Sequence, residues 1–178
     1  MKIIIALGLA AFFLVGCADM ASAPAVKYKD SEMPVPAGYK SWSKFLSDIQ
    51  RPDAKQVRDI YVNTAGSAAQ KGQAFANGTV FVMENYAARE NPDGTLMKGA
   101  DGKLVKGNLL RVFLMGKGEG WGDSAPQGLK NGDWVYAPYS ADGKPSAEPV
   151  AACRACHLPL VKQDFVFRYD EYFDQRAK

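Results

Sequence analysis

Histidine and cysteine are scarce in this chain of 178 residues, which has one histidine and three cysteines. A structural zinc site normally takes four ligands, and the two cysteines and one histidine near residue 155 supply only three, so zinc is not expected there. The net charge is only +3, and the lysines and arginines are scattered rather than massed in one stretch. The charge pattern therefore gives no reason to expect binding to nucleic acid or recruitment to an anionic membrane.

Two glycine-rich stretches lack the features of known ligand-binding loops. Residues 116–122 have Trp121 where the last glycine of G-x-G-x-x-G would fall, and no Gly-Lys-Ser/Thr follows. Two near copies of Asp-Gly-x-Leu-x-Lys-Gly, at 93–99 and 101–107, contain too few acidic residues for a calcium loop. We expect a turn at the first stretch and a projecting hairpin or loop at the second.

The N-terminus has the layout of a bacterial export signal. Lys2 precedes an apolar run over residues 3–15, too short to span a membrane, and the run ends in Leu14-Val15-Gly16-Cys17, which resembles a lipobox. We expect residues 1–16 to be a lipoprotein signal peptide, Cys17 to carry the lipid, residues 17–35 to be a flexible tether and residues 36–178 to be the folded domain. The alternative is an ordinary signal peptide cleaved near residues 21–23. With Ala18 after Cys17 and no aspartate, the outer membrane is favoured over the inner, with the domain facing the periplasm.

The other two cysteines and the histidine form the string Cys153-Arg154-Ala155-Cys156-His157. This C-x-x-C-H pattern is typical of c-type haem attachment, in which both thiols add to haem vinyl groups and the adjacent imidazole binds the iron. The alternative, a redox-active Cys153–Cys156 pair, would need a thioredoxin-like βαβ setting that this segment lacks. We predict one covalent heme c per chain, with His157 on the metal. No second imidazole is present in the chain, so the sixth iron ligand must be Met, Lys, water or nothing.

The rest of the chain reads as a mixture of strands and helices. Alternating patterns predict strands at residues 57–62, 79–87, 109–115 and 134–139, and on the second of these Phe81, Met83 and Asn85 point the same way. Helical spacing predicts helices at residues 41–49, 65–75 and 149–156. Most c-type cytochromes are small and all-helical, so the strands are informative.

Several strings follow the order seen in the cytochrome P-460 family, which includes the beta-sheet cytochromes c-prime. The chain resembles that family from about residue 36 to residue 173. The matching residues are Gly38-Tyr39, Trp42, Ile60-Tyr61-Val62-Asn63, Asn77-Gly78-Thr79-Val80-Phe81-Val82, Glu84, Gly120-Trp121-Gly122, the haem string, Asp164 and Val166-Phe167. The resemblance implies an α+β fold in which helices pack on an antiparallel β-sheet. It also implies a haem held against that sheet and a homodimer.

Met83 stands where cytochromes P-460 have a lysine that is covalently joined to the haem edge and accompanies hydroxylamine oxidation. A thioether cannot form that link, so we expect no efficient hydroxylamine oxidation. The beta-sheet cytochromes c-prime lack the link and bind gases such as nitric oxide at an open iron. Met83 packs on the haem edge, binds the iron or fills the core, of which we favour the first; Met115 and Met97 are weaker ligand candidates. Phe81 either caps the distal pocket or fills the core.

Glu148 matches a carboxylate that, in the family, lies shortly before the haem motif and relays protons at the distal site. The alternative is a solvated residue in the turn at 145–149. The leading function is a lipid-anchored, periplasm-facing mono-haem cytochrome that binds small nitrogenous ligands such as nitric oxide. The alternatives are a His/Met electron-transfer cytochrome with a periplasmic redox partner, and a haem-dependent oxidoreductase acting on hydroxylamine or nitric oxide through Glu148.

Overall fold

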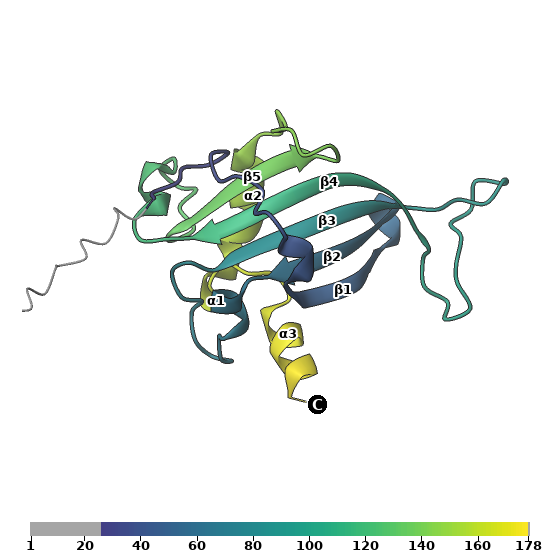
Figure 1. Ribbon diagram of the computed structural model, residues 1–178, viewed down its shortest axis with the longest axis horizontal. Coiled ribbons are helices and arrows are strands. Elements are labelled where there is room, and N and C mark those ends of the chain that lie inside the picture. Colours follow the sequence, from purple (N-terminus) through teal and green to yellow (C-terminus); the bar gives the residue numbers. More distant parts are fainter. Residues whose placement is uncertain (1–25, 178) are drawn as a thin grey trace, which may run out of the picture.

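The computed structural model describes residues 26–177 and contains one antiparallel sheet of five strands in the order β1-β2-β3-β4-β5 (Figure 1). The strands are β1 (Ser43–Arg51), β2 (Gln56–Val62), β3 (Val80–Ala88), β4 (Lys106–Lys117) and β5 (Trp134–Ser140). The helices are α1 (Thr64–Ser67), α2 (Val150–His157) and α3 (Tyr169–Arg176), with a 3-10 helix, η4 (Leu158–Gln163), between the last two. The predicted α+β fold is confirmed, as are the four predicted strands.

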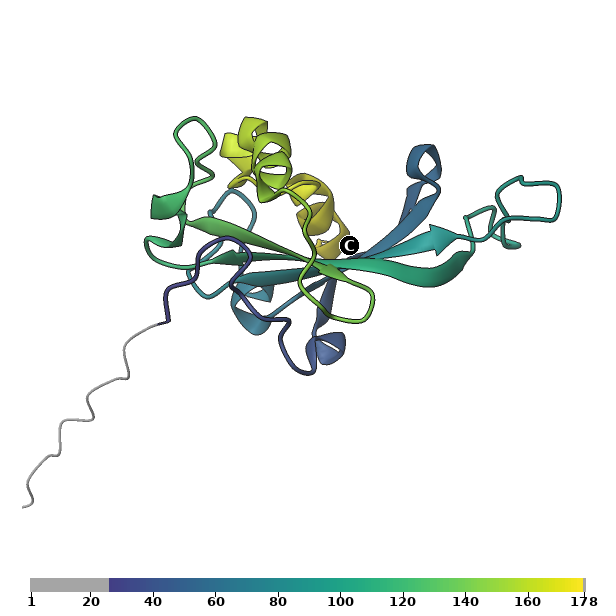
Figure 2. The same cartoon turned by 90° about the horizontal axis from the view of Figure 1, so that it is seen from above.

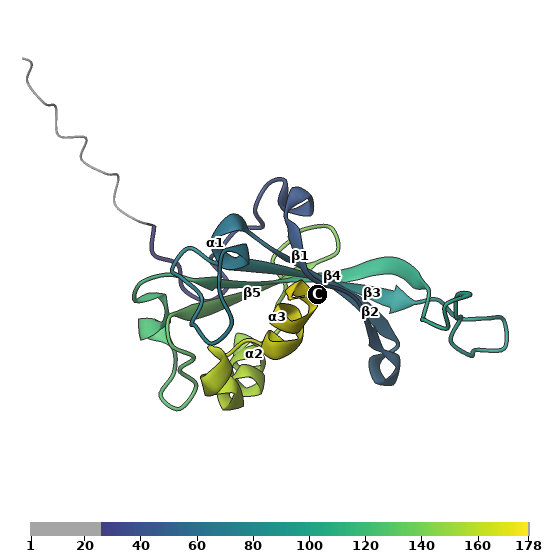
Figure 3. The same ribbon diagram turned by 90° about the horizontal axis from the view of Figure 1, so that it is seen from below.

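The two faces of the sheet are covered by different parts of the chain. Figures 2 and 3 show α2 and α3 on one face, together with the tip of the β1–β2 hairpin, which curls toward the same side. The segment before β1 lies on the other face (Figure 2). The helical face carries an aromatic core that includes Phe45, Phe75, Phe81, Trp134 and Phe173. The fold is therefore a single sheet with α2, α3 and an aromatic core packed on one face.

The predicted helix at residues 41–49 is wrong, because this segment forms β1. The pairing of β1 with β2 shifts register between Lys44 and Leu46 and again between Leu46 and Ile49. These irregularities break the strict alternation of a strand, so Phe45, Leu46 and Ile49 are all buried. A bulged strand has thus produced the i, i+3, i+4 spacing of a helix.

The predicted helix at residues 65–75 is also largely wrong, because only the four residues of α1 are α-helical. The Asn63 side chain caps α1 by accepting a hydrogen bond from the Gly66 amide at 3.1 Å. Gly72 has φ +86°, a conformation that does not continue a helix. The remainder is a loop that delivers Phe75 to the core, where its amide donates to Asp164 Oδ2 at 2.8 Å.

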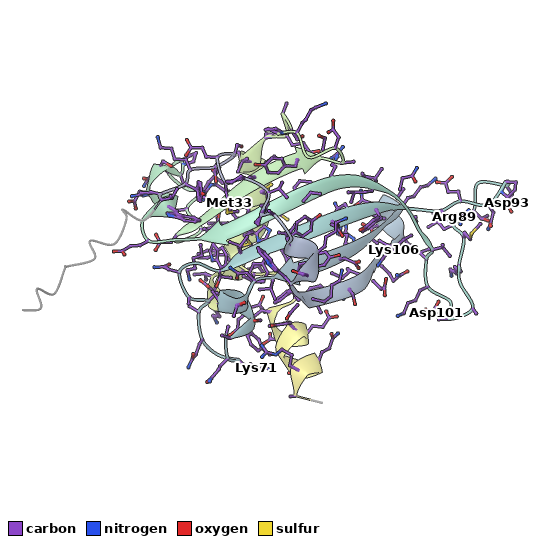
Figure 4. All side chains as sticks on the ribbon, in the orientation of Figure 1. Met33, Lys71, Arg89, Asp93, Asp101 and Lys106 are labelled. Carbon is purple, nitrogen blue, oxygen red and sulfur yellow. The ribbon has the colours of Figure 1, made fainter. Side chains whose placement is uncertain are left out.

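The two Asp-Gly repeats form an arm that projects from the sheet, as expected. Figure 4 places Asp93 and Asp101 in this arm, far from the sheet. Isolated bridges join Glu90 to Leu96 and Lys98 to Leu104. In the first repeat Asp93 Oδ1 accepts from the Thr95 amide at 3.0 Å, which closes the turn.

The predicted signal peptide and the lipidation site Cys17 lie outside the described residues. The expected tether at 17–35 is described only from residue 26 on, and there it packs on the sheet. Met33 is 3% exposed, its carbonyl accepts from the Tyr139 hydroxyl at 2.7 Å, and the Ser31 amide donates to Tyr136 O at 2.8 Å. We call residues 26–36 the N-terminal strap. No helix in the described part is long and apolar enough to cross a membrane.

The face beneath the strap buries two carboxylates. Glu84 is fully buried and accepts hydrogen bonds of 2.6 Å from both Tyr39 and Tyr86, with Lys40 Nζ 3.3 Å away. Burial by itself would raise the pKa of Glu84, but the hydrogen bonds from the two tyrosines and the charge of Lys40 lower it overall. The second carboxylate, Asp59, accepts hydrogen bonds from the ammonium groups of Lys44 and Lys106. Both carboxylates are structural anchors, on the face opposite the helices.

Candidate haem site

Helix α2 presents the C-x-x-C-H string to the sheet. The helix begins after Pro149, which lacks an N–H and so suits a helix start, and it ends at His157. Cys153 and Cys156 are three residues apart, so their thiols lie on the same side of the helix. Cys153 is half-buried, Cys156 is exposed, and both line the same cavity as His157.

The chain after α2 turns back to hold the His157 ring. Asp164 and Phe165 both have positive φ, 50° and 61°, and this turn brings the Phe165 carbonyl to 2.7 Å from His157 Nδ1. Asp164 is fixed in turn by Lys117 Nζ, at 2.8 and 2.9 Å. Burial lowers the pKa of His157, against a smaller opposing effect of the Phe165 carbonyl. With Nδ1 bonded to a carbonyl, Nε2 is the nitrogen left to bind a metal.

Arg154, a variable residue of the motif, is the anchor of α2. Its side chain is almost fully buried and makes a two-point ion pair with Asp30 of the N-terminal strap, at 2.6 and 2.9 Å. It also donates to the carbonyls of Trp134 and Leu129, at 3.1 and 3.4 Å, and to Asn131 Oδ1 at 3.5 Å. The motif helix is thereby tied both to the start of β5 and to the strap.

A cavity of about 680 Å³ lies between α2 and the sheet. This size is within the range of about 300–1,000 Å³ typical of small-molecule and cofactor sites. The wall opposite the cysteines is mostly apolar and comes from neighbouring strands; it includes Ile60, Phe81, Met83, Phe113 and Met115. His157 stands beside this wall, its ring 5.1 Å from that of Tyr136 and 4.8 Å from that of Phe167.

The structure places five of the predicted site residues in the lining of one cavity. These are Phe81, Met83, Cys153, Cys156 and His157. A sixth, Glu148, is absent from the lining and pairs with Arg111, which lies opposite the lining residue Asn85 in the sheet. Of the weaker methionine candidates, Met115 lines the cavity, whereas Met97 is in the projecting arm.

Comparison with known families identifies the scaffold. A family model described as Cytochrome P460 matches residues 36–168, which covers most of the described chain. The chain belongs to the cytochrome P460 family. No curated protein matches it. Membership of the cytochrome P460 family implies a haem cofactor, and the resemblance seen in the sequence is confirmed.

The residues of the cavity suit the haem of a cytochrome P460. Two thiols and one imidazole with an available Nε2 are the donor set for a covalently held haem, and the opposite wall is apolar like a porphyrin ring. Two buried polar atoms that line the cavity, Tyr136 Oη and Asn85 Oδ1, have no partner among the described residues. Buried polar atoms rarely stay unpaired, so a bound group with polar atoms of its own is expected there.

Several residues of this site escaped the sequence analysis. Arg154 occupies a variable position of the motif, where nothing in the string marks it as buried. Tyr136 and Phe113 lie on predicted strands, but which face of the sheet their side chains occupy depends on how the strands pair. Arg58 alternates with Ile60 on β2, and that alternation was the one available signal that it shares the face of the cavity.

Proposed function

We propose that this member of the family is a mono-haem c-type cytochrome that binds small nitrogenous ligands such as nitric oxide. In this proposal Cys153 and Cys156 hold the haem covalently, one per chain, and His157 is its axial ligand. The observation that carries the proposal is that one cavity is lined by Cys153, Cys156 and His157 and, opposite them, by an apolar wall. When bound, the haem iron supplies the position at which a diatomic gas binds.

The chain's own groups support an open iron position. His157 is the only histidine in the sequence, so a second imidazole cannot come from the same chain. Phe81 and Phe113 make their part of the cavity wall apolar, which favours a small neutral ligand over a charged one there. Met83 is half-buried in the same wall, where its flexible thioether fills space beside the ring.

A second candidate function rests on the same methionine. Because Met83 lines the cavity opposite the motif helix, its sulfur is the alternative sixth ligand, and a His/Met iron would favour electron transfer with a periplasmic partner. Oxidoreductase chemistry through Glu148 has less support, since that carboxylate is paired with Arg111 outside the cavity lining.

An absorption spectrum of the purified, haem-loaded protein tests the main proposal. We expect a high-spin ferrous spectrum that changes when nitric oxide is added, in both the natural protein and a Met83→Ala variant. The proposal would be refuted if the natural protein gave sharp low-spin bands that do not change with nitric oxide and if Met83→Ala converted them to high-spin bands. That result would favour the electron-transfer cytochrome.

We also propose that the protein is anchored at the periplasmic side of a bacterial outer membrane through Cys17, and that it forms a homodimer. C-type haem is attached outside the cytoplasm, which fits the export signal. Expression of the full chain and of Cys17→Ala, followed by membrane fractionation, tests the anchor. Only the natural chain should sediment with membranes, and recovery of both in the soluble fraction would contradict the anchor. Sedimentation velocity of Cys17→Ala tests the dimer, which a monomer mass at micromolar concentration would refute.

A further inference from the structure

The sheet wall of the cavity changes from apolar to polar along the strands. The first row across β2, β3 and β4 is Val62, Phe81 and Met115, and the second is Ile60, Met83 and Phe113. The third row is Arg58 on β2, Asn85 on β3 and Arg111 on β4, of which Arg58 and Asn85 line the cavity and Arg111 is paired with Glu148. The cavity therefore has an apolar body and one polar end, close to the curled tip of the β1–β2 hairpin.

Arg58 is the cavity cation that has no acidic partner among the described residues. Its Nε and Nη2 both donate to one neutral acceptor, Gln56 Oε1, at 3.3 and 3.0 Å. The other two guanidinium groups of the lining are paired, Arg51 with Asp53 and Arg168 with Glu171. A partly buried cation without a counterion is unfavourable, and burial followed by the charge of Arg51 lowers the pKa of Arg58. An anion in the cavity would relieve this cost.

The position of Arg58 relative to the cysteines indicates which anion. The vinyl groups and the two carboxylates of haem occupy opposite edges of the ring. Cys153 and Cys156 are on α2, which packs on β5 at one edge of the sheet, whereas Arg58 is on β2 near the other edge. A haem joined to these thiols and lying along the wall would therefore turn its carboxylate edge toward the β2 side of the cavity.

We propose that Arg58, with the Asn85 amide beside it, is the binding site for the haem carboxylates. This inference rests on the proposed function, because it takes the haem to be attached at Cys153 and Cys156. A guanidinium binds a carboxylate through two parallel N–H donors, which lysine cannot reproduce. The Asn85 Nδ2 lies in the same cluster, because it donates to Gln56 Oε1 at 3.4 Å beside the two Arg58 donors, and its Oδ1 has no partner among the described residues.

The test compares holo-protein of the natural chain with Arg58→Gln, Arg58→Lys and Arg89→Gln. Arg89 is an exposed guanidinium at the base of the arm, so its replacement makes the same charge change away from the cavity (Figure 4). The readouts are the carboxylate bending band in the resonance Raman spectrum, the midpoint potential at fixed pH, and the affinity for nitrite as a free anion. In the natural protein, an NMR contact between the Arg58 δ-protons and the haem carboxylate methylenes gives a test that needs no variant.

We expect Arg58→Gln to shift the bending band and to lower the midpoint potential, because loss of a nearby cation favours the oxidised, more positive iron. Arg58→Lys should retain the charge effect but still shift the band, and Arg89→Gln should match the natural protein. Equal behaviour of Arg58→Gln and Arg89→Gln, or no NMR contact, would overturn the proposal. Loss of nitrite affinity with an unchanged band would also overturn it, since Arg58 would then serve a free anion. A natural chain without covalent haem would instead refute the proposed function itself.

Discussion

The ion pair between Arg154 and Asp30 offers the sharpest test of how the haem helix is held. Arg154 is 1% exposed, and the bidentate contact with Asp30 supplies its only carboxylate partner among the described residues. Replacing Asp30 by Asn preserves the shape but leaves a buried guanidinium with neutral acceptors alone. Breaking a buried pair from one side costs about 3–5 kcal/mol. For a chain of this size each kcal/mol lowers Tm by about 2–4 °C, so Asp30→Asn should melt about 6–20 °C lower.

Thermal unfolding followed by circular dichroism measures this effect, and the strap supplies a matched control. Lys27 and Asp123 form a second ion pair from the strap, at 2.9 Å, but both side chains are largely exposed. Asp123→Asn should therefore leave Tm almost unchanged. The double variant Asp30→Asn, Arg154→Met should recover much of the loss, because it also removes the unpaired buried charge. If Asp30→Asn melts no lower than Asp123→Asn, the strap does not anchor α2 and the reasoning fails.

Three further predictions follow from the same structure. Replacement of both Cys153 and Cys156 by Ser should abolish covalent haem, seen as loss of the haem mass in denatured protein; a retained mass would contradict attachment at α2. Because Met83 offers no amine, hydroxylamine with an electron acceptor should not be turned over efficiently, and recovery of the cross-linked chromophore would refute this. The lowered pKa of Glu84 adds stability that is present above its unfolded pKa of about 4.3 and lost as pH falls through the folded value. Glu84→Gln should flatten that part of the stability curve, which urea unfolding between pH 2 and 6 would show.

The sequence predicted best where a pattern has a single structural meaning. Alternation over residues 79–87 can only place Phe81, Met83 and Asn85 on one face, and the cavity lining agrees. The two segments wrongly predicted as helices had patterns with two meanings. In β1, bulges bury Phe45 and Leu46 next to each other, which imitates a helical stripe. Around residue 70, helical composition was not matched by an apolar face that could dock.

The missing parts of the site are those that depend on strand register and long-range pairing. Which residues share a row, such as Arg58 with Asn85, follows from how β2 and β3 align, and no local pattern states that alignment. The partner of Arg154 is 124 residues away at Asp30, in a segment whose composition indicates a linker. The composition of a segment indicates only whether that segment tends to be ordered. It does not indicate which distant acidic residue the fold will place beside a buried arginine.

The attachment motif is held in place from both of its ends by the sheet. At its start, Arg154 bonds the Trp134 carbonyl at the beginning of β5 and the strap beside it. After its end, Lys117 at the end of β4 fixes Asp164, and the adjacent Phe165 carbonyl fixes His157 Nδ1. The last residue of β4, Lys117, lies opposite the first residue of β5, Trp134, so both contacts come from the same end of this strand pair. The protein contacts on both sides of the motif thus orient the imidazole, with Nδ1 bonded to the Phe165 carbonyl and Nε2 left to bind a metal.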